Sequence, residues 1–178
     1  MENKGFGLVH IYCGDGKGKT TAALGLAVRA AGRGKQVLIA RFLKTEDSGE
    51  VSVLRQIPGI QVLPCEKSFG FTFQMTEEVR REAGAYYSQV LEKAAEAARN
   101  ERIHLLILDE ILGACNAGLV EKARLEHILK TRPSGLEVVL TGRNPWESLL
   151  ESADYITEMK PVRHPYEKGV MAREGIEY

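Results

Sequence analysis

The sequence has no surplus of either charge and few cysteines. Its 24 lysines and arginines equal its 24 aspartates and glutamates, so it lacks the basic excess of a typical nucleic-acid-binding protein. The three cysteines, Cys13, Cys65 and Cys115, lie far apart and form no CxxC pair. An odd and scattered count argues against a disulfide framework and favours a reducing compartment. We therefore expect no nucleic-acid partner and no disulfides.

Long apolar runs and metal-binding patterns are missing as well. No apolar run reaches the roughly 20 residues that a membrane-spanning helix needs, and the N-terminal residues lack the apolar core of a signal peptide. The four histidines do not have the spacing of metal ligands. These absences predict a cytoplasmic protein that has no membrane partner.

The pattern that is present alternates short apolar runs with longer helical segments. The 178 residues fit one domain, which we expect to cover positions 1–178 without a linker or an internal repeat. Strands are expected at 8–13, 36–42, 60–63, 103–108, 137–140 and 155–159. Helices are expected at 19–31, 50–57, 76–100 and 120–130, with a short helix capped by Asn144 and opened by Pro145. This alternation is typical of an α/β protein with a mostly parallel sheet covered by helices on both faces.

A glycine-rich segment lies between the first expected strand and the first expected helix. It consists of Gly14, Asp15, Gly16, Lys17, Gly18, Lys19, Thr20 and Thr21. In this context glycines let backbone N–H groups converge on phosphate oxygens, and the helix N-terminus adds its positive dipole end. We expect the segment to hold the triphosphate of ATP, with Lys19 on the outer phosphates and the Thr20 hydroxyl on Mg²⁺. The usual GxxxxGK[ST] pattern would place a glycine at Cys13, so the loop is a variant.

A second motif completes the predicted phosphate site. Four apolar residues at 105–108 lead into Asp109 and Glu110, which is the pattern of a Walker B strand. Such an acid holds Mg²⁺ directly or through water. Either carboxylate could reach the metal, so Thr20, Asp109 and Glu110 are the candidate metal ligands.

The motifs leave three kinds of P-loop enzyme open: a small-molecule kinase, an ATPase switch, and a transferase that uses another part of ATP. The signature lysine of partition ATPases would stand at Gly14, so the switch is less favoured. The basic residues Arg41 and Lys44 after the second strand suit any of the three. Phe69, Phe71 and Phe73 form an aromatic cluster in an expected loop, which indicates a flat hydrophobic ligand, a partner, or simple core packing.

The sequence resembles the P-loop ATP:corrinoid adenosyltransferases over nearly its whole length. The matching motifs are GDGKGKTTAA at 14–23, GFTF at 70–73, LDE at 108–110, LTGR at 140–143, EMKPVRH at 158–164 and GVMAREGIEY at 169–178. The C-terminal motifs are the most specific, because a generic P-loop protein has no need of them. The resemblance implies a RecA-like P-loop fold, usually as a homodimer.

The resemblance also implies a reaction. Family members transfer the 5′-deoxyadenosyl group of ATP to Co(I) of cobalamin or cobyrinic acid a,c-diamide and release tripolyphosphate. Lys19, the loop amides, Arg143, and Mg²⁺ held at Thr20 and Glu110 are then expected to bind ATP and its leaving group. Phe71 and Phe73 are expected to line the lower face of the corrin, although some relatives have Trp at position 73. A flavin-dependent protein is the implied electron donor.

Overall fold

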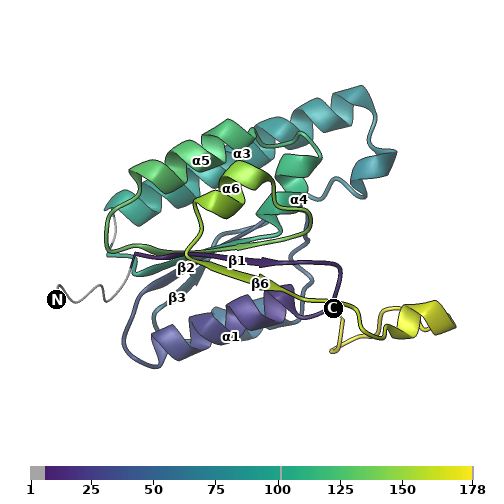
Figure 1. The fold of residues 1–178 in the computed structure, drawn as a ribbon, viewed down its shortest axis with the longest axis horizontal. Helices are drawn as coiled ribbons and strands as arrows, with labels where there is room; N and C mark the ends of the chain where they lie inside the picture. The colour runs from purple at the N-terminus through teal and green to yellow at the C-terminus, as the bar shows by residue number, and fades with distance from the viewer. Residues whose placement is uncertain (1–6, 101, 178) are drawn as a thin grey trace.

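A six-stranded, all-parallel sheet forms the centre of the computed structural model, which describes residues 7–100 and 102–177 (Figure 1). The strands are β1 (Val9–Cys13), β2 (Val37–Arg41), β3 (Ile60–Val62), β4 (Leu105–Asp109), β5 (Glu137–Thr141) and β6 (Tyr155–Glu158). Their order in the sheet is β3-β2-β4-β5-β1-β6. The α/β class and the parallel sheet predicted from the sequence are therefore confirmed.

Helices cover both faces of the sheet (Figure 1). On one face lie α1 (Lys19–Ala31) and α2 (Glu50–Leu54). On the other face lie α3 (Glu77–Asn100), α4 (Ile111–Asn116), α5 (Lys122–Thr131) and α6 (Glu147–Glu151). Every residue of β2 and of β4 is buried as a result. Burial on both faces explains why these strands appear in the sequence as nearly continuous apolar runs.

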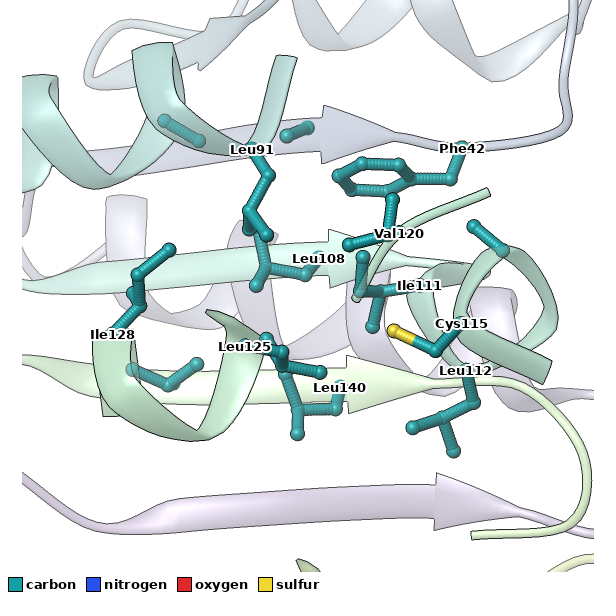
Figure 2. Close-up of a cluster of buried hydrophobic side chains, with 14 of the residues drawn as sticks. Phe42, Leu91, Leu108, Ile111, Leu112, Cys115, Val120, Leu125, Ile128 and Leu140 are labelled. Atoms are coloured by element: carbon teal, nitrogen blue, oxygen red, sulfur yellow. The ribbon is translucent and has the colours of Figure 1, made fainter. Parts of the chain in front are cut away.

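Each face of the sheet has its own apolar core. Figure 2 shows the larger one, where Leu108 and Leu140 of the sheet meet Leu91 of α3 and Leu125 of α5. Full burial of each such side chain contributes about 1.5–3 kcal/mol to stability. On the opposite face Ala23 and Ala27, both fully buried, let α1 pack closely on the sheet. This close packing fixes the position of the N-terminus of α1 relative to the ends of the strands.

The structure differs from the sequence predictions at several element boundaries. Helix α4 was not predicted, because its short apolar run follows β4 directly and has no periodicity of its own. The helix expected to be capped by Asn144 begins at Glu147, with Trp146 at its N-cap, while Asn144 adopts a left-handed backbone with φ 50°. Short 3-10 helices, η1 (Thr72–Gln74) and η2 (Pro165–Lys168), occur in segments that were expected to be irregular.

Two further observations concern the helices. Thr76 caps α3, because its Oγ1 accepts a 3.3 Å hydrogen bond from the backbone N–H of Val79. Among the described residues, no helix combines the length and the apolar character needed to cross a membrane.

Candidate active site

The phosphate loop, residues 14–18, joins β1 to α1 at the carboxyl edge of the sheet. Gly14 and Gly18 have φ angles of 101° and 115°, in the left-handed region that favours glycine. Gly18 is also the N-cap residue of α1, where it has no side chain to cap the first N–H groups of the helix. These groups therefore point their hydrogens and the positive end of the helix dipole toward the loop, as phosphate binding requires.

The end of β6 packs directly against this loop. The backbone N–H of Gly16 donates a 2.7 Å hydrogen bond to the carbonyl oxygen of Met159. A Cβ atom at Gly14 would lie 2.5 Å from that same oxygen, and one at Gly16 would lie 2.6 Å from it. The glycines are thus required by the neighbouring backbone as well as by any phosphate. This contact was not predicted, because it depends on which strand lies beside β1.

Lys19 holds its ammonium group over the phosphate loop. Its Nζ donates hydrogen bonds of 2.7 Å and 2.9 Å to the carbonyl oxygens of Gly14 and Gly16. Burial lowers the pKa of Lys19, an effect that the carboxylate of Glu110 opposes. The ammonium group therefore lies over the loop, and the role of Lys19 on the outer phosphates stays a prediction.

Asp109 connects the two predicted motifs. It ends β4, is 1% exposed, and accepts hydrogen bonds at Oδ1 from the hydroxyls of Thr20 (2.9 Å) and Thr141 (2.7 Å). Its other oxygen, Oδ2, lies 3.0 Å from Nζ of Lys44. The structure therefore brings the threonine of the glycine-rich segment and the first acid of the Walker B motif into direct contact.

Glu110 lies next to this contact in a constrained backbone conformation. It is the N-cap residue of α4, with φ 62°, and its N–H donates a 2.8 Å hydrogen bond to Thr141 Oγ1. Burial raises the pKa of Glu110, and the nearby charge of Asp109 raises it further, whereas Lys44 and Lys19 oppose the shift. Both carboxylates of the motif thus face the lysines of the site.

The oxygens at this point suit Mg²⁺. Mg²⁺ is usually held by one or two carboxylates together with substrate phosphates, and here Thr20, Asp109 and Glu110 offer one hydroxyl and two carboxylates. Asp109 Oδ2 is buried and makes no aligned hydrogen bond, so it has a lone pair left for a cation. Within 7–100 and 102–177, no cluster of three or more His, Cys, Asp or Glu residues could hold a metal by itself. This donor set fits a metal site that a phosphate ligand completes.

A cleft of about 840 Å³ opens beside the phosphate loop. Its polar lining includes Lys17, Lys19, Thr20, Thr21, Lys44 and Glu110. Its apolar lining comes from Leu24 and Val28 of α1 and from Val53, Leu54 and Ile57 in and after α2. Small-molecule sites commonly have this size and this mixture of apolar walls and a few polar groups.

The C-terminal segment also reaches this cleft. Gly175, Ile176 and Glu177 line it, and Glu177 Oε1 lies 3.0 Å from Nζ of Lys17 in the phosphate loop. Hydrogen bonds from Arg173 and from Lys17 lower the pKa of Glu177 to about 2. No helix or strand was predicted after position 159, and the contact of this segment with the phosphate loop is a finding of the structure.

Arg143 lies at the outer side of the phosphate loop. Its Nε is 3.4 Å from Oδ1 of Asp15, and both side chains are exposed. Arg143 follows β5 closely, and its charge contributes to the lowered pKa of Lys19. The predicted nucleotide-binding arginine is therefore close to the loop, although the described lining of the cleft does not include it.

The predicted aromatic cluster separates into two parts. Phe71 and Phe73, the aromatic pair, are 68% and 79% exposed and stack with ring centroids 5.5 Å apart. Phe69 instead packs against Tyr86 and Tyr87 of α3, with ring centroids 5.7 Å away in each case. Core packing, one of the three interpretations of the cluster, therefore applies to Phe69, whereas Phe71 and Phe73 are exposed. Phe73 lies within the short 3-10 helix η1, and Phe71 precedes it.

Arg80 of α3 fixes the backbone beside the aromatic pair. Its Nη2 donates a 3.0 Å hydrogen bond to the carbonyl oxygen of Thr72, and its Nη1 donates a 2.6 Å bond to that of Ala117 after α4. The aromatic pair does not line the cleft, but η1 lies beyond the same carboxyl edge of the sheet as the phosphate loop (Figure 1). One edge of the sheet thus carries both the phosphate site and an exposed aromatic surface.

The fold and the site together define the class. A glycine-rich loop between a strand and a helix, with its threonine bonded to an acid at the end of a nearby parallel strand, is the site of a P-loop nucleotide-binding protein. The strand β5 lies between β1 and β4, the strands that carry the two motifs.

Comparison with known proteins identifies the family within this class. The family model described as "ATP:corrinoid adenosyltransferase BtuR/CobO/CobP" matches residues 5–178. The chain is 34% identical over 174 residues to a corrinoid adenosyltransferase of Sinorhizobium sp., covering 97% of this chain and 80% of that protein. It is 32% identical over 173 residues to the corrinoid adenosyltransferase of Escherichia coli K12, covering 97% and 86%. It is 33% identical over 174 residues to corrinoid adenosyltransferase CobA of Salmonella typhimurium, covering 97% and 86%. The chain belongs to the ATP:corrinoid adenosyltransferase family.

Proposed function

We propose that this protein transfers the 5′-deoxyadenosyl group of ATP to Co(I) of a corrinoid, either cobalamin or cobyrinic acid a,c-diamide, and releases tripolyphosphate. Family membership over residues 5–178 supports the reaction class. The observation that carries the proposal is the exposed, stacked aromatic pair at the same edge of the sheet as the phosphate site. A kinase or an ATPase switch does not need such a surface, whereas an enzyme that binds a flat macrocycle does.

The chemistry matches the groups in the site. The electron pair of Co(I) forms a bond to C5′ of the ribose, the C5′–O bond breaks, and its electrons leave with tripolyphosphate. Cobalt carries no proton, so the reaction requires no general base. Catalysis therefore depends on positioning the two substrates and on stabilising the charge of the leaving group. Lys19 and the N–H groups at the start of α1 would supply that stabilisation, with Arg143 at the outer side of the loop.

Thr20, Asp109 and Glu110 would hold Mg²⁺ together with the phosphates. When bound, the ion adds positive charge next to the leaving group. Thr141 supports this role, because its hydroxyl donates to Asp109 while it accepts from the N–H of Glu110. Both acids are thus held by one threonine at the end of the strand between the two motifs.

The aromatic pair would form an apolar wall against the lower face of the corrin. By excluding the lower axial ligand and water, such a wall favours four-coordinate Co(II), which accepts an electron more readily than Co(II) with a lower ligand. A flavin-dependent protein would supply that electron to give Co(I). Arg80 anchors the backbone of η1 through the carbonyl oxygen of Thr72, and both rings are exposed to a ligand. We further propose that the enzyme works as a homodimer in the cytoplasm.

The direct test mixes the protein with MgATP and chemically reduced cob(I)alamin. Formation of adenosylcobalamin, followed by the visible spectrum, together with one equivalent of tripolyphosphate would support the transferase. Phosphate release from ATP without corrinoid would instead indicate an ATPase, and a phosphorylated small molecule would indicate a kinase. A parallel reaction with cobyrinic acid a,c-diamide would rank the two corrinoids by kcat/KM.

A further inference from the structure

Lys44 makes two contacts that the proposed chemistry does not use. Its Nζ donates a 3.0 Å hydrogen bond to Thr20 Oγ1 and lies 3.0 Å from Asp109 Oδ2. Its side chain is 23% exposed, and it lines the cleft beside the phosphate loop. Lys44 is therefore a third lysine in the lining of the cleft, brought there by β2 rather than by the phosphate loop.

The segment after β2 is built to present this lysine. Leu43 has φ 55°, a left-handed conformation that a residue with a side chain adopts only where its surroundings enforce it. Phe42, just before it, donates a 2.8 Å backbone hydrogen bond to the carbonyl oxygen of Asp109. The turn at Leu43 thus begins beside Asp109, and the next side chain, that of Lys44, reaches the Asp109 carboxylate.

A buried arginine holds the other side of this segment. Arg41 is 3% exposed, and its guanidinium donates to the carbonyl oxygen of Thr45 (2.8 Å) and to Glu46 Oε1 (2.9 Å). The same Glu46 oxygen accepts from the backbone N–H of Cys65, whose Sγ lies 2.8 Å from the carbonyl oxygen of Lys44. Contacts on both sides therefore hold the backbone of this segment, while the side chain of Lys44 is partly exposed in the cleft.

The contacts of Lys44 conflict with those of a metal ion. Thr20 and Asp109 supply oxygens that suit Mg²⁺, and the ammonium group already contacts both, through a hydrogen bond to Thr20 and an ion pair with Asp109. Two cations on the same oxygens repel each other, so a metal that binds here must displace Nζ of Lys44. Because the backbone is fixed and the side chain lines the cleft, the ammonium group can turn into the space that Lys19 also faces.

We propose that Lys44 is an exchanging phosphate ligand. It pairs with Asp109 and Thr20 before the metal binds, and it moves to the polyphosphate chain when the metal takes those oxygens. Its ligand is a linear polyphosphate, either the triphosphate of ATP or the tripolyphosphate product. This inference rests on the proposed function, because the transferase releases tripolyphosphate inside the site. Lys44 would then add a second lysine to the charge that stabilises the leaving group.

Two measurements on Lys44→Met test the exchange, and neither depends on turnover. The first is the affinity of the ligand-free protein for Mn²⁺, which binds like Mg²⁺ to oxygen ligands and can be followed by its EPR signal. The second is the affinity for tripolyphosphate at saturating Mg²⁺, measured by calorimetry. We expect Mn²⁺ to bind several-fold more tightly and tripolyphosphate to bind on the order of tenfold more weakly, because a charge-assisted hydrogen bond is lost.

Controls make the outcomes distinct. Lys67→Met removes a lysine that is also ion-paired, to Glu82 at 2.6 Å, but lies outside the cleft, and should change neither affinity. Lys44→Gln retains a donor for Thr20 without the charge and serves if the methionine variant does not fold. Unchanged Mn²⁺ affinity or unchanged tripolyphosphate affinity in the Lys44 variants would overturn the exchange. Failure of the wild-type protein to form adenosylcobalamin from MgATP and cob(I)alamin would instead overturn the proposed function.

Discussion

The backbone N–H of Gly16 and the carbonyl oxygen of Met159 are joined by a 2.7 Å hydrogen bond between the phosphate loop and the residue after β6. A Cβ atom at position 16 would lie 2.7 Å from the carbonyl carbon of Met159 and 2.9 Å from that of Lys160. Real Cβ atoms do not approach backbone atoms so closely, so the loop accepts only glycine here. The loop and the last strand are therefore one structural unit.

Gly16→Ala should lower the stability of the protein as well as its affinity for ATP. Relief of the clash must move either the loop or the end of β6, and overpacking of this kind costs about 1–3 kcal/mol. Urea unfolding followed by circular dichroism measures the loss. Gly135→Ala is the matched control, because a Cβ there meets nothing within 4 Å. Equal stability of the two variants would contradict the tight contact.

Lys19→Ala should abolish adenosyl transfer. The leaving group would lose the ammonium that lies over the phosphate loop, a loss of about 3 kcal/mol or more in the transition state, which is roughly 100-fold in rate. Turnover at saturating MgATP and cob(I)alamin measures the effect, with the exposed Lys130→Ala as control. More than a tenth of wild-type turnover in Lys19→Ala would show that the phosphates bind elsewhere.

Substitution of the two acids should change the Mg²⁺ requirement more than nucleotide binding. In Glu110→Ala we expect the Mg²⁺ concentration for half-maximal activity to rise on the order of tenfold, since a charged metal ligand is removed. Asp109→Asn should have a larger effect, because Asp109 also accepts from Thr20 and Thr141. Metal titrations of both variants, with ATP binding measured in EDTA, separate the two effects. An unchanged Mg²⁺ response in both variants would remove this carboxylate pair from the metal site.

Phe73→Ala should affect the two routes to adenosylcobalamin unequally. Loss of one ring of the stacked pair opens the wall to water, so turnover that starts from Co(II) with a flavin donor should fall strongly. Transfer to pre-formed Co(I) should fall only moderately, and ATP binding should stay nearly intact. The spectrum of bound Co(II) corrinoid should shift with the wild-type protein and ATP but not with the variant.

The matched control for Phe73 is Tyr155→Ala. Tyr155 is another exposed aromatic residue, but it lies at the start of β6, where it stacks on His10 at 4.6 Å. This variant should retain both routes. Equal losses by both routes in Phe73→Ala would mean that the aromatic pair has a packing role only.

The three cysteines should resist alkylation in the folded protein. All three are buried, and burial raises the pKa of Cys115 to about 12. Burial likewise raises the pKa of Cys13 and that of Cys65. A raised thiol pKa lowers the fraction of reactive thiolate, so the rate should stay low from pH 7 to about pH 9, where a free cysteine is largely ionised. Mass spectrometry after iodoacetamide treatment counts the modified residues; rapid labelling of native Cys115 would contradict its burial.

The sequence was sufficient for the features that depend on local pattern. Apolar runs such as 105–108 identified buried parallel strands, and the glycines before Lys19 identified the phosphate loop. Thr20, Asp109 and Glu110 were predicted as candidate ligands of one metal ion, and the structure brings Thr20 and Asp109 into contact. These are the cases in which spacing along the chain and position in the fold are directly related.

Features that depend on distant neighbours were not predictable in the same way. Phe69, Phe71 and Phe73 alternate in the sequence, but only Phe69 finds Tyr86 and Tyr87 to pack against. The ion pair between Lys44 and Asp109 depends on β2 lying beside β4 and on the turn at Leu43. Sequence pattern gives the types of these residues, but the pairing of strands decides which of them meet.

The position of β1 in the sheet also has a consequence for biosynthesis. Among the described residues, β1 pairs only with β5 and β6, the last two strands to leave the ribosome, whereas β2, β3 and β4 pair with one another earlier. The ribosome synthesises the N-terminus first, so β1 has no strand to pair with through most of translation. The phosphate loop, which needs Met159, can assemble only after that residue has emerged. Ribosome-bound chains that stop before β6 should therefore be unable to retain ATP. We expect ATP binding to become possible only late in the folding of this enzyme.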